Sequence, residues 1–457
     1  MLTRSNTSRA KMSLIGGMSG VTLPTGKYVN SIAEQFPSDQ RHHKIESTIS
    51  NRYIRDFLPI NANVSNGEVR DNYIEFVLNS SQQEFYDCDS FALEMKIKIT
   101  KADGTDLDPV ANHVSVIDGL GHRILSKSSL YLNGTPCENN AYFGLFNSLK
   151  TYTCMKKDAL SSIGRNMYYK DLHVKNNSKT DEINFLAPEN DEKLIRDDCR
   201  RVMHFVTPLA LDISSSDFFL LNGVDIRLRF DLASPAVIIN SYDNEKYKYN
   251  IQSVKLWAQK LVPQSNALLS MNRSLIEKNS RVEYIFERPV IKNYVYPIGQ
   301  SILSLDNIFN GIIPHEVYLL LINQDALNGD YKQNAAYFQH GNVNNIQLDV
   351  NGNTVSSMSA SFPNHVASMF HHTLSNLKDD NNLLTLESFK AGRTIHSWDL
   401  RATDCNDTLA VERTGNLRIN IQSATPNTDT MVVFVIGITT GLLEIDSARR
   451  VHTSYLM

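Results

Sequence analysis

The residue patterns that mark reactive sites occur in this sequence only in incomplete form. Residues 20–27 (GVTLPTGK) resemble a phosphate-binding loop, but five residues separate Gly20 from Gly26 where that loop has four. Tyr28 then stands where a Ser or Thr would hold magnesium. The sequence also contains no Gly-x-Ser-x-Gly elbow and no His-Glu-x-x-His motif. We therefore expect no nucleotide binding, no cofactor and no enzymatic activity.

Histidines and aspartates are present, but their spacing does not suit a metal ion. His42–His43 and His371–His372 are adjacent pairs, whereas ligands on one strand stand two residues apart and ligands on one helix stand four apart. Carboxylates in polar loops could coordinate a divalent cation between subunits, but solvated loop charge is the simpler interpretation. These carboxylates are Asp325, Asp330, Asp379 and Asp380. We expect no metal site.

Cysteine usage and hydropathy bear on the cellular compartment. The five cysteines are odd in number, widely spread, and lack CxxC pairs or finger spacing, so we expect free thiols in a reducing compartment. They are Cys88, Cys137, Cys154, Cys199 and Cys405. No charged and apolar leader opens the chain, and glycines and threonines interrupt its longest apolar stretch, residues 431–443. We expect neither secretion nor a membrane span.

Charge is nearly balanced over the chain but not at its beginning. The 45 basic and 49 acidic residues give no overall basic field of the kind that nucleic-acid binding requires. Residues 1–33 contain no acid and are rich in Ser, Thr and Gly, which suits a mobile arm. Their basic residues, which could contact packaged DNA, are Arg4, Arg9, Lys11 and Lys27. We expect a flexible basic arm over residues 1–50.

The rest of the chain is dominated by short runs in which apolar and polar residues alternate. In residues 224–230, for example, Val224, Ile226 and Leu228 fall on one face and the charged residues fall on the other, as in a half-buried strand. Further runs occur at residues 73–78, 91–99 and 417–421. Helical patterns are few and short, at residues 142–152, 266–277 and 366–377.

The two halves of the chain carry the same signals in the same order, which indicates an internal repeat. In the first half these are residues 91–100, 130–135, a helical segment, 205–213, 223–230 and 251–262. In the second half they are residues 316–324, 348–353, a helical segment, 395–400, 415–421 and 431–445. The matched Asn133–Gly134 and Asn351–Gly352 pairs predict hairpin turns, and residues 175–201 are the natural insertion, which we expect to be a surface loop.

About eight antiparallel strands per copy predict an all-β protein of two tandem jelly-roll barrels with short helical insertions. A tandem pair of immunoglobulin-like modules is the alternative, but such modules have about 100 residues and are too short for these halves. We assign residues 51–265 to the first jelly roll, 266–280 to a connector and 281–457 to the second.

From about Phe57 to its C-terminus, the sequence resembles the double jelly-roll major capsid protein of Polinton (Maverick) elements and adintoviruses. The resemblance rests on residues 121–134 (GHRILSKSSLYLNG), 218–228 (FFLLNGVDIRL), 308–317 (IFNGIIPHEV) with 325–331 (DALNGDY), and 443–446 (LEID). It implies a hexon-like homotrimer with a pseudo-hexagonal outline that tiles an icosahedral shell of the virion, assembled inside the host cell. A separate single jelly-roll penton protein would fill the fivefold vertices.

The resemblance also gives the arm an expected processing site. Leu14, Gly16, Gly17 and Met18 (in LIGGM) resemble the sequence cut by adenovirus-type cysteine proteases, which Polinton-like elements also encode, with cleavage after Gly17. The competing function is a jelly-roll protein that binds a carbohydrate or a receptor. Its loops would carry clustered aromatic residues, whereas the long loops here are mostly polar, so we favour the capsid protein and expect no specific small-molecule partner.

Overall fold

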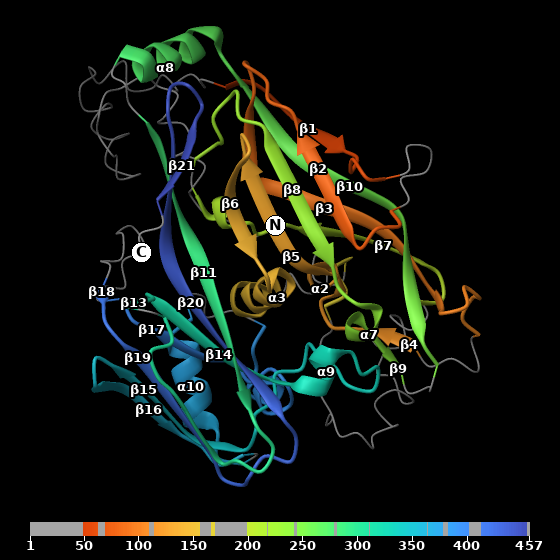
Figure 1. Cartoon of the computed structure of the whole chain (residues 1–457), viewed down its shortest axis with the longest axis vertical. Coiled ribbons are helices and arrows are strands. Elements are labelled where there is room, and N and C mark those ends of the chain that lie inside the picture. The colour runs from red at the N-terminus through yellow and green to blue at the C-terminus, as the bar shows by residue number, and fades with distance from the viewer. Residues whose placement is uncertain are drawn as a thin grey trace, which may run out of the picture.

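The computed structural model describes residues 49–62, 69–108, 114–155, 166–169, 199–216, 218–241, 245–277, 281–309, 311–362, 364–377, 383–401 and 413–454. In this part of the chain the strands form two sets, each made of a pair of four- or five-stranded sheets with smaller two-stranded sheets beside them. Figure 1 shows the first set in red to green and the second in green to blue. Among the described residues, no helix has the length and apolarity to cross a membrane.

The first set of strands forms a barrel from two facing sheets. One sheet has the order β1-β10-β3-β7, the other has the order β2-β8-β5-β6, and β4 pairs with β9 at one end. The strands are β1 (Ile49–Phe57), β2 (Tyr73–Leu78), β3 (Phe85–Lys101), β4 (Val114–Val116), β5 (Leu125–Leu132), β6 (Thr135–Asn140), β7 (Val202–Pro208), β8 (Ile226–Leu232), β9 (Ile239–Ser241) and β10 (Tyr247–Pro263).

The second set repeats this arrangement. Its sheets have the orders β11-β20-β14-β17 and β12-β19-β15-β16, with β21 added to β20 and β13 paired to β18. The strands are β11 (Val282–Tyr296), β12 (Ile302–Leu305), β13 (Ile312–Ile313), β14 (Glu316–Asn323), β15 (Val343–Val350), β16 (Asn353–Ser359), β17 (His396–Asp399), β18 (Arg413–Thr414), β19 (Leu417–Ser423), β20 (Met431–Ile445) and β21 (Val451–Ser454).

Helices are short and lie in the connections. They are α2 (Leu120–Arg123), α3 (Phe143–Cys154), the 3-10 helix η3 (Asp212–Ser215), α7 (Pro235–Ile238), α8 (Ser265–Glu277), α9 (Gln324–Asn328), α10 (Ala367–Ser375) and α11 (Leu386–Lys390). The three longest, α3, α8 and α10, occupy the three segments where the sequence predicts helices, to within a few residues.

The order of strands in the two barrels confirms both the repeat and the fold class. In the first barrel β10 lies between β1 and β3 and β2 pairs with β8; in the second, β20 lies between β11 and β14 and β12 pairs with β19, which is the same jelly-roll connectivity. The equivalent helices α3 and α10 each follow the hairpin that an Asn-Gly turn closes. All four turn residues, Asn133, Gly134, Asn351 and Gly352, have positive φ angles, as a type I′ turn requires.

Alternation in the sequence correctly predicts which side chains face the barrel interiors. In β8, Ile226, Leu228 and Phe230 are buried, while Arg227 and Arg229 between them are exposed. The same pattern holds in β19. Burial of every second side chain is what makes these segments strands, because only the extended backbone puts alternate residues on one face.

Two segments differ from the prediction. The run predicted over residues 205–213 ends its strand at Pro208, and its last part belongs to η3. Strand β1 begins at Ile49, inside the range predicted as a flexible arm, where its backbone pairs with β10. Residues 1–48 lie outside the described residues, as do residues 175–198 of the predicted insertion.

Strands β11 and β20 reach beyond the second barrel to the first. They pair over their whole lengths, from Val282 opposite Ile445 to Tyr296 opposite Met431, without a register shift. The apolar side chains at the Val282 and Ile445 ends belong to the hydrophobic core of the first barrel. The far ends, at Tyr296 and Met431, belong to the core of the second barrel. This ribbon therefore spans both barrels, as Figure 1 shows.

Candidate functional site

The junction between the two barrels contains a hydrophobic core of its own. Helix α3 of the first barrel packs against the β14–β20 face of the second, and their apolar side chains form a third hydrophobic core. Its largest members include Phe146 and Tyr152 from α3, with Phe338 and Phe434 from the second barrel. The helix lies close to the chain behind it, since a Cβ on Gly144 would come within 2.6 Å of the His122 carbonyl oxygen.

A buried ion pair lies in the middle of this junction. Asp118, which precedes α2 in the first barrel, accepts a 3.0 Å hydrogen bond from Arg393, which precedes β17 in the second. The exposed fractions of the two side chains are only 2% and 3%. The Tyr152 hydroxyl donates to the same carboxylate oxygen at 2.7 Å, and the Arg393 guanidinium stacks on the Tyr152 ring, 4.6 Å from its centre. One Asp118 oxygen atom thus accepts a hydrogen bond from each barrel.

Beside the ion pair, a buried histidine is held neutral. His122 Nε2 lies 3.0 Å from the Pro208 carbonyl oxygen, which can only accept, so this nitrogen carries the proton. Nδ1 then accepts from the Tyr169 hydroxyl at 2.8 Å. Burial lowers the pKa of His122 to about 4 and raises the pKa of Tyr169 to about 12. Both groups therefore stay uncharged at neutral pH.

Hydrogen bonds extend the junction along the β11–β20 ribbon. The Tyr284 hydroxyl of β11 accepts from the Leu221 N–H at 2.9 Å and donates to the Phe219 carbonyl at 3.1 Å. Near the end of the chain, Arg449 donates to both the backbone and side-chain oxygens of Asn222, at 2.7 Å and 2.8 Å. These bonds join residues far apart in the sequence, so they fix the orientation of one barrel relative to the other.

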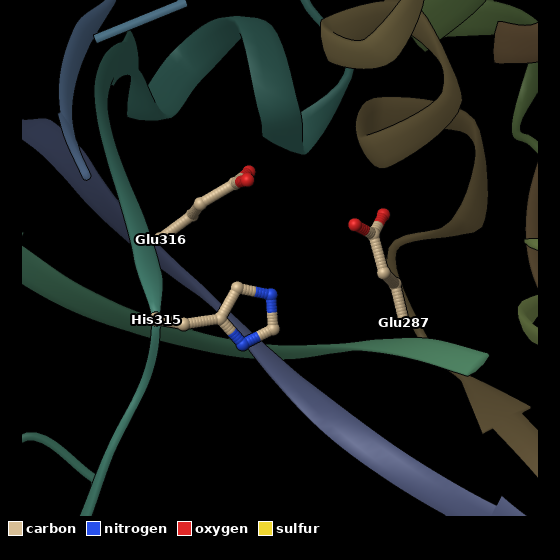
Figure 2. A group of neighbouring side chains, drawn as sticks. All are labelled: Glu287, His315 and Glu316. Atoms are coloured by element: carbon tan, nitrogen blue, oxygen red, sulfur yellow. The ribbon is translucent and has the colours of Figure 1, made fainter. Parts of the chain in front are cut away.

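A cluster of titratable side chains lies at the rim of the junction, next to α3. Glu287, His315 and Glu316 each offer a ligand atom, and these atoms all lie within 4.8 Å of one another. Figure 2 shows the two carboxylates and the imidazole turned toward a common space. Lys150 of α3 is 3.9 Å from Glu287, and Arg401 is 3.3 Å from Glu316. The described part of the chain yields only this group of potential metal ligands.

The local sequence pattern does not predict this cluster. His315 and Glu316 are adjacent, but Glu287 belongs to β11, and the strand between them in the sheet, β20, comes more than a hundred residues later. The predicted candidates fall elsewhere. His372 bonds to Ser356 at 3.1 Å, and the N–H of Asp325 begins α9 by donating to Asn323.

Several predicted residues cannot be placed. The processing segment with Leu14, Gly16, Gly17 and Met18 lies outside the described residues, as do the arm's Arg4, Arg9, Lys11 and Lys27. The same holds for His42, His43, Asp379, Asp380 and Cys405. Cys137 and Cys154 are free thiols, as the sequence predicts.

Comparison with known proteins gives one sequence relative. The chain is 21% identical over 378 residues to the uncharacterized protein F54H12.2 of Caenorhabditis elegans, covering 77% of this chain and 86% of the relative. No protein-family model matches the chain.

Solved structures resemble the chain over nearly its whole length. A chain of the Sputnik virophage superposes with a TM-score of 0.59 and 13% identity, covering 96% of this chain and 93% of its own. The mavirus major capsid protein gives a TM-score of 0.53 and 12% identity, covering 96% of both chains. The PBCV-1 virus capsid gives 0.57 and 10%, covering 91% of this chain and 100% of that chain. The chain therefore has the fold of double jelly-roll major capsid proteins. Its particular likeness is to the capsid proteins of virophages, of mavirus and of PBCV-1.

Neutral buried histidines make the folded chain sensitive to acid. His396 is fully buried, neither ring nitrogen has a hydrogen-bond partner among the described residues, and burial lowers its pKa to about 3. Unfolding restores a pKa of about 6.5 to His122 and His396, so the unfolded chain binds more protons between about pH 6.5 and 4. The free energy of unfolding should fall with pH there by ~1.4 kcal/mol per pH unit for each histidine.

His396→Leu should reduce the pH dependence of the free energy of unfolding by the contribution of one histidine. We expect no loss of stability at pH 7, because the change removes two buried polar atoms that have no hydrogen-bond partner among the described residues. Denaturant unfolding at pH 5 and pH 7 measures the slope. Val355→Thr, a change at an exposed residue of β16 without a titratable group, is the control and should leave the slope unchanged. Equal slopes in His396→Leu and the unaltered chain would show that His396 titrates normally in the folded state.

The Asp118–Arg393 pair should be costly to break from one side. Arg393→Met leaves a buried carboxylate without its guanidinium partner, and such a loss costs about 3–5 kcal/mol. Adding Asp118→Asn should recover part of this, because it removes the orphaned charge. Denaturant unfolding of the two single variants and the double variant measures the coupling.

Arg418→Met is the matched control, because Arg418 pairs with Asp306 on the surface, where both side chains are about half exposed or more. We expect this control to cost less than about 1 kcal/mol. A cost for Arg393→Met no larger than that of the control would mean that the pair does not stabilise the junction.

Proposed function

We propose that this chain is a major capsid protein that assembles into a homotrimeric, pseudo-hexagonal capsomer of an icosahedral virion shell. The observation that carries the proposal is the repeated jelly roll: both barrels have the same strand order, and a buried junction fixes their mutual orientation. Three such chains around a threefold axis present six similar barrels, which is a shape that packs into a hexagonal lattice. The role is structural, and we propose no enzymatic activity.

Exposed apolar side chains support self-association. In the first barrel, Ile54 within β1 and Ile60, three residues after its end, are 66% and 59% exposed. In the second barrel, Ile298, two residues after the end of the equivalent strand β11, and Ile302, at the start of β12, are 61% and 62% exposed. Exposed apolar groups near the first strand of both repeats suit contacts between neighbouring barrels in a ring, because repeated contacts bury them together.

We propose three structural units for the chain: a basic arm over residues 1–50, a first jelly roll over residues 51–265 and a second over residues 281–457, joined by residues 266–280. Helix α8 (Ser265–Glu277) occupies most of the connector, which supports this division. The nematode relative supports an origin in a Polinton (Maverick) element, since such elements reside in host genomes. A single jelly-roll penton protein would complete the shell at its vertices.

The trimer has a definite mass. Three chains of 51.6 kDa give about 155 kDa. Light scattering of the purified protein should report this mass, and negative-stain images of the same fraction should show hexagonal outlines. The double variant Ile298→Lys/Ile302→Lys should shift the population toward the single-chain mass, because buried lysines at a subunit contact are strongly unfavourable.

Val355→Lys is the matched control for the double variant. Val355 is 54% exposed on β16 and belongs to neither apolar group, so the trimer mass should persist. A monodisperse species of one chain, unchanged across salt and pH, would contradict the capsomer proposal and favour a monomeric binding protein.

For the arm we propose two roles. Before cleavage, Arg4, Arg9, Lys11 and Lys27 face the capsid interior and contact packaged DNA, where each neutralised phosphate releases counterions. A viral adenain-like cysteine protease then cuts after Gly17, which removes all of these basic residues except Lys27.

Intact mass spectrometry of the coat protein from purified particles tests the processing. The expected mass corresponds to a chain that begins at Met18, and a Gly17→Val variant should instead retain residue 1 because the cleaved bond loses its small residue. A full-length mass in mature particles of the unaltered protein would contradict the cleavage.

A further inference from the structure

The cluster of Glu287, His315 and Glu316 crosses three strands of one sheet. Strand β20 lies between β11 and β14, with Glu287 opposite Thr440 and Glu316 opposite Ile438. These two positions on β20 are two residues apart, so Glu287 and Glu316 project from the same face of the sheet and reach over β20. Ile438 belongs to the core between the barrels. The cluster therefore lies at the edge of that core, on the face that meets α3.

Two backbone hydrogen bonds hold His315 in position. The His315 N–H donates to the Ile438 carbonyl at 2.9 Å, and the His315 carbonyl accepts from the Leu400 N–H at 2.8 Å. His315 precedes the first residue of β14, so its side chain is not bound by the alternation of that strand. Figure 2 shows its ring turned to the same space as the two carboxylates.

One carboxylate is oriented by a neighbour. The Tyr318 hydroxyl donates to Glu316 Oε2 at 3.1 Å. Glu316 is 6% exposed, so its position is set by packing rather than by solvent. Hydrogen bonds of this kind, from a group behind the ligand, hold metal-binding carboxylates in place and are typical of metal centres.

Five charged side chains at the cluster carry a net negative charge. Glu287, Glu316 and Asp399 carry three negative charges, and Lys150 and Arg401 carry two positive ones, so these five groups sum to −3 + 2 = −1. Arg401 Nε also bonds to both oxygens of Asp399, at 2.9 Å and 3.0 Å, so it keeps a partner when Glu316 binds elsewhere. The Lys150–Glu287 pair is loose at 3.9 Å and partly exposed, and such pairs contribute little.

The chemistry of the three ligands selects the type of ion. One imidazole nitrogen with two carboxylate oxygens suits zinc and similar divalent transition ions. Calcium and magnesium take oxygen ligands almost exclusively, so a histidine in the set disfavours them. Three protein ligands leave one coordination position for water.

We propose that Glu287, His315 and Glu316 form a binding site for a zinc-class divalent ion at the rim of the junction between the barrels. The ion links β11 to β14 across β20 and stiffens the sheet face that α3 packs against. This site does not depend on the proposed capsid role, since its ligands all come from one chain.

Equilibrium dialysis of the purified full-length protein against ZnCl2, with metal analysis of both chambers, tests the site. We expect one strongly bound zinc per chain, a rise in Tm with added zinc because the ion binds only the folded state, and no matching rise with CaCl2 or MgCl2. His315→Asn and Glu316→Gln should each abolish the strong binding. Tyr318→Phe should weaken it by about 10–100-fold, because it removes only the orienting hydrogen bond.

His371→Asn and Glu283→Gln are the matched controls, because both residues are exposed on the same barrel, outside the cluster, and should leave the zinc content unchanged. Near-ultraviolet circular dichroism of each variant, compared with the unaltered chain, separates lost ligands from a lost fold. Equal zinc in the unaltered chain and in folded His315→Asn would place the ion on surface histidines and overturn the proposal. So would an absence of strong zinc binding, or binding of calcium in its place.

Discussion

The arrangement of the molecule depends on how two barrels of the same topology are held at one fixed orientation. Each barrel has its own core, and the ends of β11 and β20 from the second barrel complete the core of the first. The third core and the Asp118–Arg393 pair within it connect them. Burying two charges is favourable only when their partners and geometry are right, so the pair penalises every other docking angle of the barrels. Apolar packing alone would tolerate more sliding, because the hydrophobic effect has no direction.

This constraint matters for a capsomer. A chain that contributes two barrels to a ring must present them at a constant angle, since an error at the junction would repeat at each of the three copies. Several independent contacts hold the two barrels together at the junction: the α3 helix in the third core, the Tyr284 and Arg449 hydrogen bonds, and the continuous β11–β20 ribbon. The Glu287–His315–Glu316 cluster lies on the same face and would add a further link when it binds an ion.

The jelly roll itself follows from a few local rules applied twice. Alternating side chains produce strands that are buried on one side, and Asn-Gly turns close the hairpin that precedes each helix. Antiparallel pairing of the first strand with the last long strand then brings the two ends of each jelly roll into one sheet. The low identity to structures with the same fold, 13% or less for those compared, agrees with this: the pattern of buried positions specifies the fold, and many different side chains satisfy it.

The sequence by itself determined the fold class, the repeat, the three longer helices and the two tight turns, because periodicity and turn chemistry act within a few residues. It also predicted free thiols. It did not reveal the end of β7 at Pro208, the pairing of Ile49 in β1, or the cluster of Glu287 with His315 and Glu316, and it predicted no metal ligands there. Only the tertiary structure brought Asp118 next to Arg393, 275 residues later, and set β20 between β11 and β14. The physical reason is that these contacts depend on the angle between two barrels and on the order of strands in a sheet. The local spacing of residues does not predict either of them.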